Sequence, residues 1–85
     1  MSWKWEFTKK SAKQITKLPP PVASQIIDKI DSYIKTNNPL LFAKSLRDHT
    51  KGQYRFRIGD YRVIFDVEDD TIVILDLGHR RDIYR

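Results

Sequence analysis

The strongest structural signal in the chain is the segment Gln53-Tyr-Arg-Phe-Arg-Ile-Gly-Asp-Tyr-Arg-Val-Ile-Phe-Asp-Val67. Two runs of β-favouring residues flank Gly59-Asp60, and a glycine followed by an aspartate between such runs favours a two-residue hairpin with a type II′ turn. This turn sets the register and places Arg57 opposite Arg62. Because side chains alternate across a sheet, the hairpin has an apolar face and a polar face. The apolar face carries Tyr54, Phe56, Ile58, Tyr61, Val63, Phe65 and Val67, and the polar face carries Gln53, Arg55, Arg57, Arg62, Ile64 and Asp66.

The apolar face is a core face, whereas the two arginines on the polar face need an explanation. Like charges directly opposite each other in a sheet are unfavourable. One explanation is that both side chains splay into water, which costs little on a solvated face. The other is that an anion binds between Arg57 and Arg62. The hairpin by itself favours two solvated arginines. The rest of the chain makes an anion site the better explanation.

Upstream of the hairpin, the chain predicts a strand and two helices. Residues 3–7 alternate between apolar and charged side chains, as a half-buried strand does. Thr8 can cap a first helix, whose apolar side is formed by Ala12, Ile15 and Leu18. Prolines 19–21 end this helix and begin a second one, which ends at residues 37–39. Its apolar residues recur at spacings of three and four: Val22, Ile26, Ile27, Ile30, Tyr33 and Ile34. So short a connection predicts an antiparallel helical hairpin that packs on the apolar face of the sheet.

Around the hairpin, the remaining segments complete the expected fold. Residues 40–46 predict one helical turn packed by Leu41, Phe42 and Leu46, followed by a polar, basic loop at residues 47–52. After an acidic turn at residues 68–70, residues 71–77 are apolar on both faces up to Asp76, which is typical of a central strand. No helix is expected after it. The prediction is a single α+β domain over residues 1–85. It has an N-terminal strand, an antiparallel helical hairpin and a three-stranded antiparallel meander, with the helices on one face of a small twisted sheet and the basic face open.

The composition narrows the class of protein. The net charge of +5 favours a polyanionic partner, most often a nucleic acid, and five lysines and arginines with only two aspartates lie between Arg47 and Arg62. The chain has no cysteine, and His49 and His79 lack metal-ligand spacing, so no disulfide, metal or other cofactor is expected. The N-terminus lacks the apolar run of a signal peptide, and the longest aliphatic run is too short to span a bilayer. A cytoplasmic protein is therefore expected.

Several segments of the chain together resemble the RelE/ParE superfamily of toxins, on its RelE side. They are Leu46-Arg47, Tyr54-Arg-Phe-Arg57, Asp60-Tyr-Arg-Val-Ile-Phe65 and Leu77-Gly-His-Arg-Arg-Asp-Ile-Tyr84. The resemblance implies a RelE-like toxin, a ribosome-dependent endoribonuclease that cleaves mRNA in the ribosomal A site without a metal. It also implies a cognate antitoxin that neutralises the toxin by covering its surface. The first alternative is a ParE-like toxin, which shares the fold, inhibits DNA gyrase and cuts nothing. The second is a catalytically silent protein that only binds RNA or an antitoxin.

The resemblance also implies roles for particular residues. Arg62 matches the catalytic arginine on the second hairpin strand, and Arg80 matches the arginine after the last strand. Tyr84 matches the tyrosine that contacts the substrate base. Arg55 and Arg57 match two basic positions on the first hairpin strand, where the best-studied members have lysines. The presence of Arg62, Arg80 and Tyr84 together favours the RelE type over the ParE type.

These side chains suit RNA cleavage by attack of a ribose 2′-hydroxyl on the adjacent phosphorus. Arg62 and Arg80 can spread positive charge over the phosphate oxygens, although an arginine on an open sheet is often only a solvated charge. Tyr84 offers a ring for base stacking, or simply packs on its neighbours. The reaction also needs a base that removes the 2′-proton, and arginine is a poor base. His79 is the nearby side chain of a type with a suitable pKa. Alternatively, His79 has no part in the reaction and the ribosome supplies the base. The remaining basic residues, which contact RNA phosphates or serve only solubility, are Arg47, Lys51 and Arg81.

Overall fold

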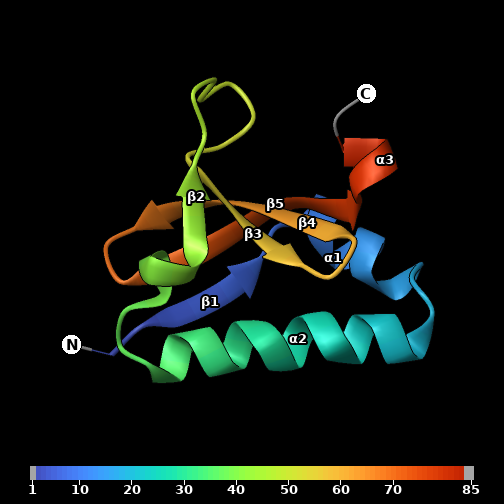
Figure 1. The fold of residues 1–85 in the computed structure, drawn as a ribbon, viewed down its shortest axis with the longest axis horizontal. Coiled ribbons are helices and arrows are strands. Elements are labelled where there is room, and N and C mark those ends of the chain that lie inside the picture. The colour runs from blue at the N-terminus through green and yellow to red at the C-terminus, as the bar shows by residue number, and fades with distance from the viewer. Residues whose placement is uncertain (1, 84–85) are drawn as a thin grey trace.

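The computed structural model describes residues 2–83, and within them five strands form one mixed sheet in the order β1-β5-β4-β3-β2. Strand β1 runs parallel to β5, and the other neighbouring strands are antiparallel. Helix α2 crosses one face of this sheet, as Figure 1 shows. In chain order the elements are β1 (Lys4–Phe7), α1 (Lys9–Thr16), α2 (Pro20–Lys35), the 3-10 helix η1 (Pro39–Phe42), β2 (Ala43–Ser45), β3 (Tyr54–Ile58), β4 (Tyr61–Glu68), β5 (Thr71–His79) and α3 (Arg80–Ile83). The predicted α+β class, with helices packed on a small sheet, is confirmed.

Helix α1 protects the edge of β5 where β1 ends. Thr8 caps the helix in a capping box with Ser11, as the sequence predicts for its N-terminus. The buried Ser11 hydroxyl donates to the carbonyl oxygen of Ile74 at 2.7 Å. One turn later, Gln14 Oε1 accepts a hydrogen bond from the Leu77 backbone N–H at 3.0 Å. Side chains of α1 therefore continue the hydrogen bonding that a longer β1 would have supplied.

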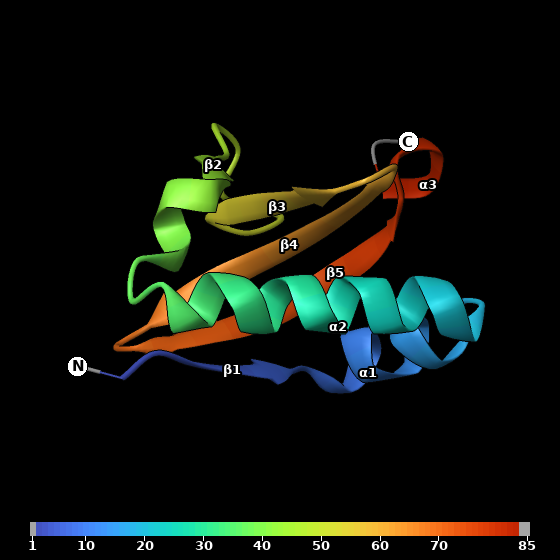
Figure 2. The same ribbon diagram turned by 60° about the horizontal axis from the view of Figure 1, so that its bottom comes forward.

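Helix α2 provides the main cover of the core. It begins at Pro20, where the missing N–H costs nothing, and its predicted apolar stripe turns Ile26, Ile30 and Tyr33 into the interior. Figure 2 shows α2 lying across the strands, with α1 beside the end of β1. The buried hydrophobic cluster between helices and sheet consists of Ile15, Ile26, Ile30, Tyr33, Phe56, Ile58, Val63, Phe65, Ile72, Ile74 and Leu77.

The central hairpin has the predicted register. Arg57 lies opposite Arg62, and Ile58 lies opposite Tyr61. Gly59 has φ of 59°, whereas Asp60 does not have a positive φ, which agrees with a type II′ turn. Strand β5 lies between β1 and β4, as the apolar run predicts for a central strand.

The segments on either side of the predicted meander differ from expectation. Residues 43–45 form an additional edge strand, β2, with Ala43 opposite Phe56, so the sheet has one strand more than predicted. Residues 39–42 do form a helical turn, but the predicted packing of Leu41 and Phe42 is wrong because they are 74% and 45% exposed. The short turn leads directly into the edge strand, which leaves these two side chains outside the core, although Phe42 stacks on Tyr33. A turn of helix, α3, also follows β5 where none was expected.

Among residues 2–83, the structure contains no helix of sufficient length and apolar character to cross a membrane.

Candidate functional site

The face of the sheet opposite α2 carries the candidate site. On this side, the loop between β2 and β3 and the short helix α3 both project away from the sheet, as Figure 1 shows. Between them lie the polar-face residues of β3 and β4. The same face therefore presents the arginines of the hairpin without a covering helix.

Arg62 is the most unusual residue of this face. It is only 5% exposed, lying between Arg57 on β3 and Gly78 on β5. Its Nη1 donates to the Tyr61 carbonyl oxygen at 3.3 Å, and its buried Nε has no acceptor within the described part of the chain. A buried donor without a partner costs about 1–3 kcal/mol. The explanation that both arginines splay into water is therefore wrong for Arg62, and it holds only for the exposed Arg57.

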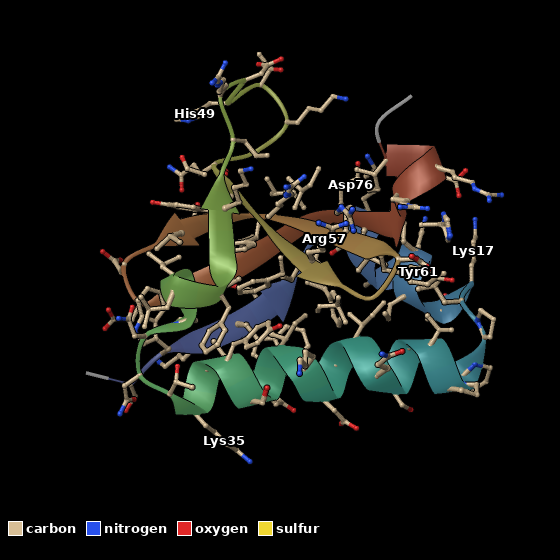
Figure 3. The ribbon with its side chains drawn as sticks, in the orientation of Figure 1. Lys17, Lys35, His49, Arg57, Tyr61 and Asp76 are labelled. Atoms are coloured by element: carbon tan, nitrogen blue, oxygen red, sulfur yellow. The ribbon has the colours of Figure 1, made fainter. Side chains whose placement is uncertain are left out.

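Three further basic residues lie on the same face of the sheet as Arg62. Arg57 lies on the part of β3 that extends beyond β2, and it also lines a cavity of about 540 Å³ between β3 and α2. Figure 3 labels Arg57 on the hairpin. Arg55 is half-buried and lies opposite both Ile64 on β4 and Lys44 on β2. Lys44 is a basic residue of this face that sequence reasoning missed, because β2 was not predicted. The alternating Ala-Lys-Ser before the loop was the available signal for it.

Helix α3 is tied to the tip of the hairpin. The Arg80 N–H donates to the Asp60 carbonyl oxygen at 2.8 Å, which brings the start of α3 next to the β3–β4 turn. Arg80 and Arg81 are both exposed there, and Ile83 is buried beneath them. Tyr84, the predicted base-contacting residue, lies outside the described residues.

His79 is not brought together with Arg62. It lies opposite Tyr61 in the β4–β5 register, so alternation places it on the other face of the sheet from Arg62. The rings of His79 and Tyr61 meet edge to face with centroids 5.4 Å apart. His79 Nδ1 accepts a hydrogen bond from the Arg81 N–H at 3.2 Å. The role of His79 as a base stays a prediction, which this geometry does not support.

The acidic residues near the arginines already have other partners. Asp66 Oδ1 accepts a hydrogen bond from the Gln53 N–H at 2.9 Å. Asp76 accepts one from Gln14 Nε2 at 2.6 Å and lies 3.4 Å from the Lys10 ammonium. These contacts engage Asp66 and Asp76 with Gln53, Gln14 and Lys10 rather than with Arg57 or Arg62. In the described range, no three His, Cys, Asp or Glu side chains gather in a way that could hold a metal ion.

The arrangement suits the binding of a phosphate-like group. A guanidinium presents several N–H donors in a plane and stays charged at all relevant pH values. Arg62 is held rigidly by burial, whereas Arg57 and Arg80 are exposed and adjustable. An anion at this face would gain from the fixed donors of Arg62 and from the repulsion that it relieves between Arg62 and Arg57.

Comparison with known proteins identifies the family. The model of a family described as the ParE toxin of type II toxin–antitoxin systems, parDE, matches residues 5–84. Toxin RelG of Mycobacterium tuberculosis is 32% identical over 87 residues, covering 100% of this chain and 99% of that protein. Toxin RelE of the same organism is 29% identical over 80 residues, covering 92% and 81%, respectively.

Solved structures show the same fold. A chain in the crystal structure of the toxin–antitoxin complex RelBE2 from Mycobacterium tuberculosis has a TM-score of 0.80 and 28% identity, covering 94% of this chain and 100% of that one. A chain in the archaeal RelE–RelB complex from Pyrococcus horikoshii OT3 has a TM-score of 0.73 and 29% identity, covering 96% and 99%. With a family match over nearly its whole length and relatives named RelE and RelG, the chain belongs to the RelE/ParE superfamily and is a toxin of a type II toxin–antitoxin system.

Proposed function

We propose that the protein is a ribosome-dependent endoribonuclease that cleaves mRNA in the ribosomal A site. The observation that carries the proposal is Arg62: a nearly buried guanidinium with an unpaired Nε, opposite a second arginine on an uncovered face. A protein tolerates such a local conflict most readily where function requires it. The relatives named RelE and the RelE complexes of the same fold agree with this assignment.

In the proposed reaction, the ribose 2′-oxygen forms a bond to the adjacent phosphorus while the bond from phosphorus to the 5′-oxygen breaks. The products are a 2′,3′-cyclic phosphate and a 5′-hydroxyl. Arg62 donates to the phosphate oxygens, whose negative charge increases in the transition state, and Arg57 and Arg80 add exposed charge around them. Because Arg62 is already oriented, little reorganisation is needed when the charge develops.

His79 lies on the other face of the sheet from Arg62, and the carboxylate of Asp76 is already engaged by Gln14 and by the Lys10 ammonium. Arginine does not lose its proton in proteins. We therefore propose that the ribosome or the mRNA supplies or positions the groups that take the 2′-proton and protonate the leaving 5′-oxygen. Because the toxin would supply charge and the ribosome would supply proton transfer, cleavage should depend on the ribosome.

The partner proposed for the free toxin is a cognate antitoxin. The solved relatives are complexes with RelB antitoxins. A net charge of +5 and an uncovered basic face favour an antitoxin segment of acidic and amphipathic character. Co-expression with the neighbouring open reading frame should restore growth of cells that make the toxin. Growth arrest that persists despite a stable complex would contradict this mode of neutralisation.

The decisive experiment maps mRNA 5′ ends on translating ribosomes with and without the purified protein. New ends inside A-site codons, together with little cleavage of free RNA even with added magnesium, are the expected result. Vigorous cleavage of free RNA would contradict ribosome dependence.

A second candidate function follows from the family model, which is named after ParE. Under this alternative, the protein inhibits DNA gyrase and leaves mRNA intact. A supercoiling assay with purified gyrase, run in parallel with the ribosome experiment, distinguishes the two. Inhibited supercoiling without new mRNA ends would favour the ParE type.

A further inference from the structure

A second feature of the uncovered face is a small cavity where the β2–β3 loop meets β4. Its volume is about 220 Å³, and its lining residues are Leu46, Arg47, Asp48, Lys51 and Ile64. Ile64 is 1% exposed and supplies an apolar wall together with Leu46, while charged side chains complete the rim. Small-molecule sites usually measure about 300–1,000 Å³, so this cavity suits a single planar ring better than a whole nucleotide.

The inner part of the loop is held firmly against the sheet. The Leu46 N–H donates to the Gln53 carbonyl oxygen at 2.9 Å, and the Val67 N–H donates to Gln53 Oε1 at 2.9 Å. Gly52 is buried directly against Ile64, since a Cβ at Gly52 would lie only 2.6 Å from Ile64 Cγ2. The cavity is therefore bounded by a loop whose base is fixed before any ligand arrives.

The cavity is next to the proposed phosphate site. Ile64 and Arg62 lie two residues apart on β4, so their side chains share one face and are separated by about 6.6 Å along the strand. A phosphate at Arg62 and a ring in the cavity would therefore belong to the same nucleotide or to adjacent ones. Single-stranded RNA exposes its bases for such contacts.

Asp48 gives the cavity its chemical preference. Its Oδ1 accepts a hydrogen bond from the Thr50 N–H at 3.0 Å. Hydrogen bonds from the side chain and the backbone of Thr50 lower the pKa of Asp48, so the carboxylate is ionised at neutral pH and can only accept. Adenine, guanine and cytosine each carry an amino group that can donate to it, whereas uracil presents two carbonyl oxygens on either side of its single ring N–H.

From this geometry we infer that the cavity receives a nucleobase flanking the cleaved phosphate, and that Asp48 selects a base carrying an amino group over uracil. The inference rests on the proposed function, because it assigns a specificity determinant to the same RNA-cleaving face. Leu46 and Ile64 contact the ring, and Arg47 and Lys51 at the rim compensate the charge of the neighbouring phosphates.

The first test compares cleavage of a set of A-site codons that differ only in whether uracil or an amino-bearing base stands at each position. The wild type should prefer amino-bearing bases about tenfold at one position next to the cut. Asp48→Asn should bring the ratio of cleavage rates for amino-bearing bases and uracil close to one, because an amide can both donate and accept hydrogen bonds. Asparagine can still form the turn with Thr50. The matched control is Asp69→Asn, which removes the same charge in the β4–β5 turn and should keep the wild-type preference.

An unchanged codon preference in Asp48→Asn, or an equal loss of rate on all codons, would overturn the inference and leave the proposed function standing. Failure of the wild type to cut any codon would contradict the proposed function instead. A measurement that needs no cleavage then decides about the cavity.

That measurement titrates the protein with AMP, GMP, CMP and UMP and follows the methyl signals of Ile64 and Leu46 by NMR. The first three nucleotides should shift these signals more than UMP does, and Asp48→Asn should remove the difference. If none of the four shifts the signals, or if all four shift them equally in the wild type, the inference is overturned.

Discussion

Arg62 on β4 and Arg57 on β3 lie directly opposite each other, yet Arg62 is only 5% exposed whereas Arg57 reaches solvent. The two like charges therefore differ in environment. Water and salt can screen the charge of Arg57 but not that of the buried Arg62. Their repulsion and the unpaired Nε of Arg62 both reduce the stability of the free protein. An anion that bound between the two guanidinium groups would relieve their repulsion.

The first prediction concerns stability. Arg57→Gln or Arg62→Gln should leave the free energy of unfolding unchanged or raise it by roughly 0.2–1 kcal/mol at low salt, because each removes the repulsion. Sulfate or phosphate should stabilise the wild type more than either variant, since an anion that binds only the folded state shifts unfolding by mass action. Thermal melts in chloride and in sulfate measure both effects. Identical responses of the wild type and both variants to sulfate would show that no anion site exists there.

The second prediction concerns activity. Arg62→Gln should reduce the rate of A-site cleavage by about 10²–10³, the usual effect of losing one oriented donor to a transition-state anion. Lys35→Gln is the control, because Lys35 is an exposed residue at the end of α2 on the opposite side of the molecule, as Figure 3 shows. Single-turnover assays on programmed ribosomes measure both rates. If Arg62→Gln cleaves at the wild-type rate, Arg62 has no role in catalysis.

The third prediction concerns the base of the β2–β3 loop. Gly52→Ala should destabilise the protein by roughly 1–3 kcal/mol, because the added Cβ would lie 2.6 Å from Ile64 Cγ2 and the residue has φ of 150°. Gly78→Ala is the control, since its Cβ would meet only Ile83 atoms at 3.6 and 3.9 Å. Chemical denaturation of both variants measures the difference. Equal stabilities would mean that the loop does not pack tightly on β4.

The fourth prediction concerns the edge of β5. Ser11→Ala should cost about 1–2 kcal/mol, because the buried hydroxyl accepts a hydrogen bond from the Thr8 N–H and donates one to the Ile74 carbonyl oxygen. Ser32→Ala is the matched control: its exposed hydroxyl donates only to the Lys29 carbonyl oxygen of its own helix, so little change is expected. Urea denaturation compares the two variants. A similar loss in both would show that the contact between Ser11 and β5 adds nothing beyond a local effect.

Much of the fold could be predicted because its signals are local. The dipeptide Gly59-Asp60 determines the turn, and the alternation of side chains then determines which residues lie opposite each other, including Arg57 and Arg62. Likewise, the spacing of Ile26, Ile30 and Tyr33 defines the buried side of α2. The strand β2 was not predicted because a periodicity over three residues is too weak a signal. Its strand conformation is stabilised by pairing with the edge of β3.

The turn and the alternation of side chains are sufficient to predict that Arg62 shares a basic face with Arg57. The tertiary structure shows in addition that Arg62 is buried and that His79 lies on the other face. It also shows that Asp48 and Ile64 line one cavity. Within one hairpin, the face of a residue follows from the turn and from alternation, whereas the face of His79 relative to Arg62 depends on how β5 pairs with β4. The burial of a residue is not a local property either. It depends instead on segments distant in sequence, such as β5, which pairs with β4, and the β2–β3 loop, whose Gly52 lies against Ile64.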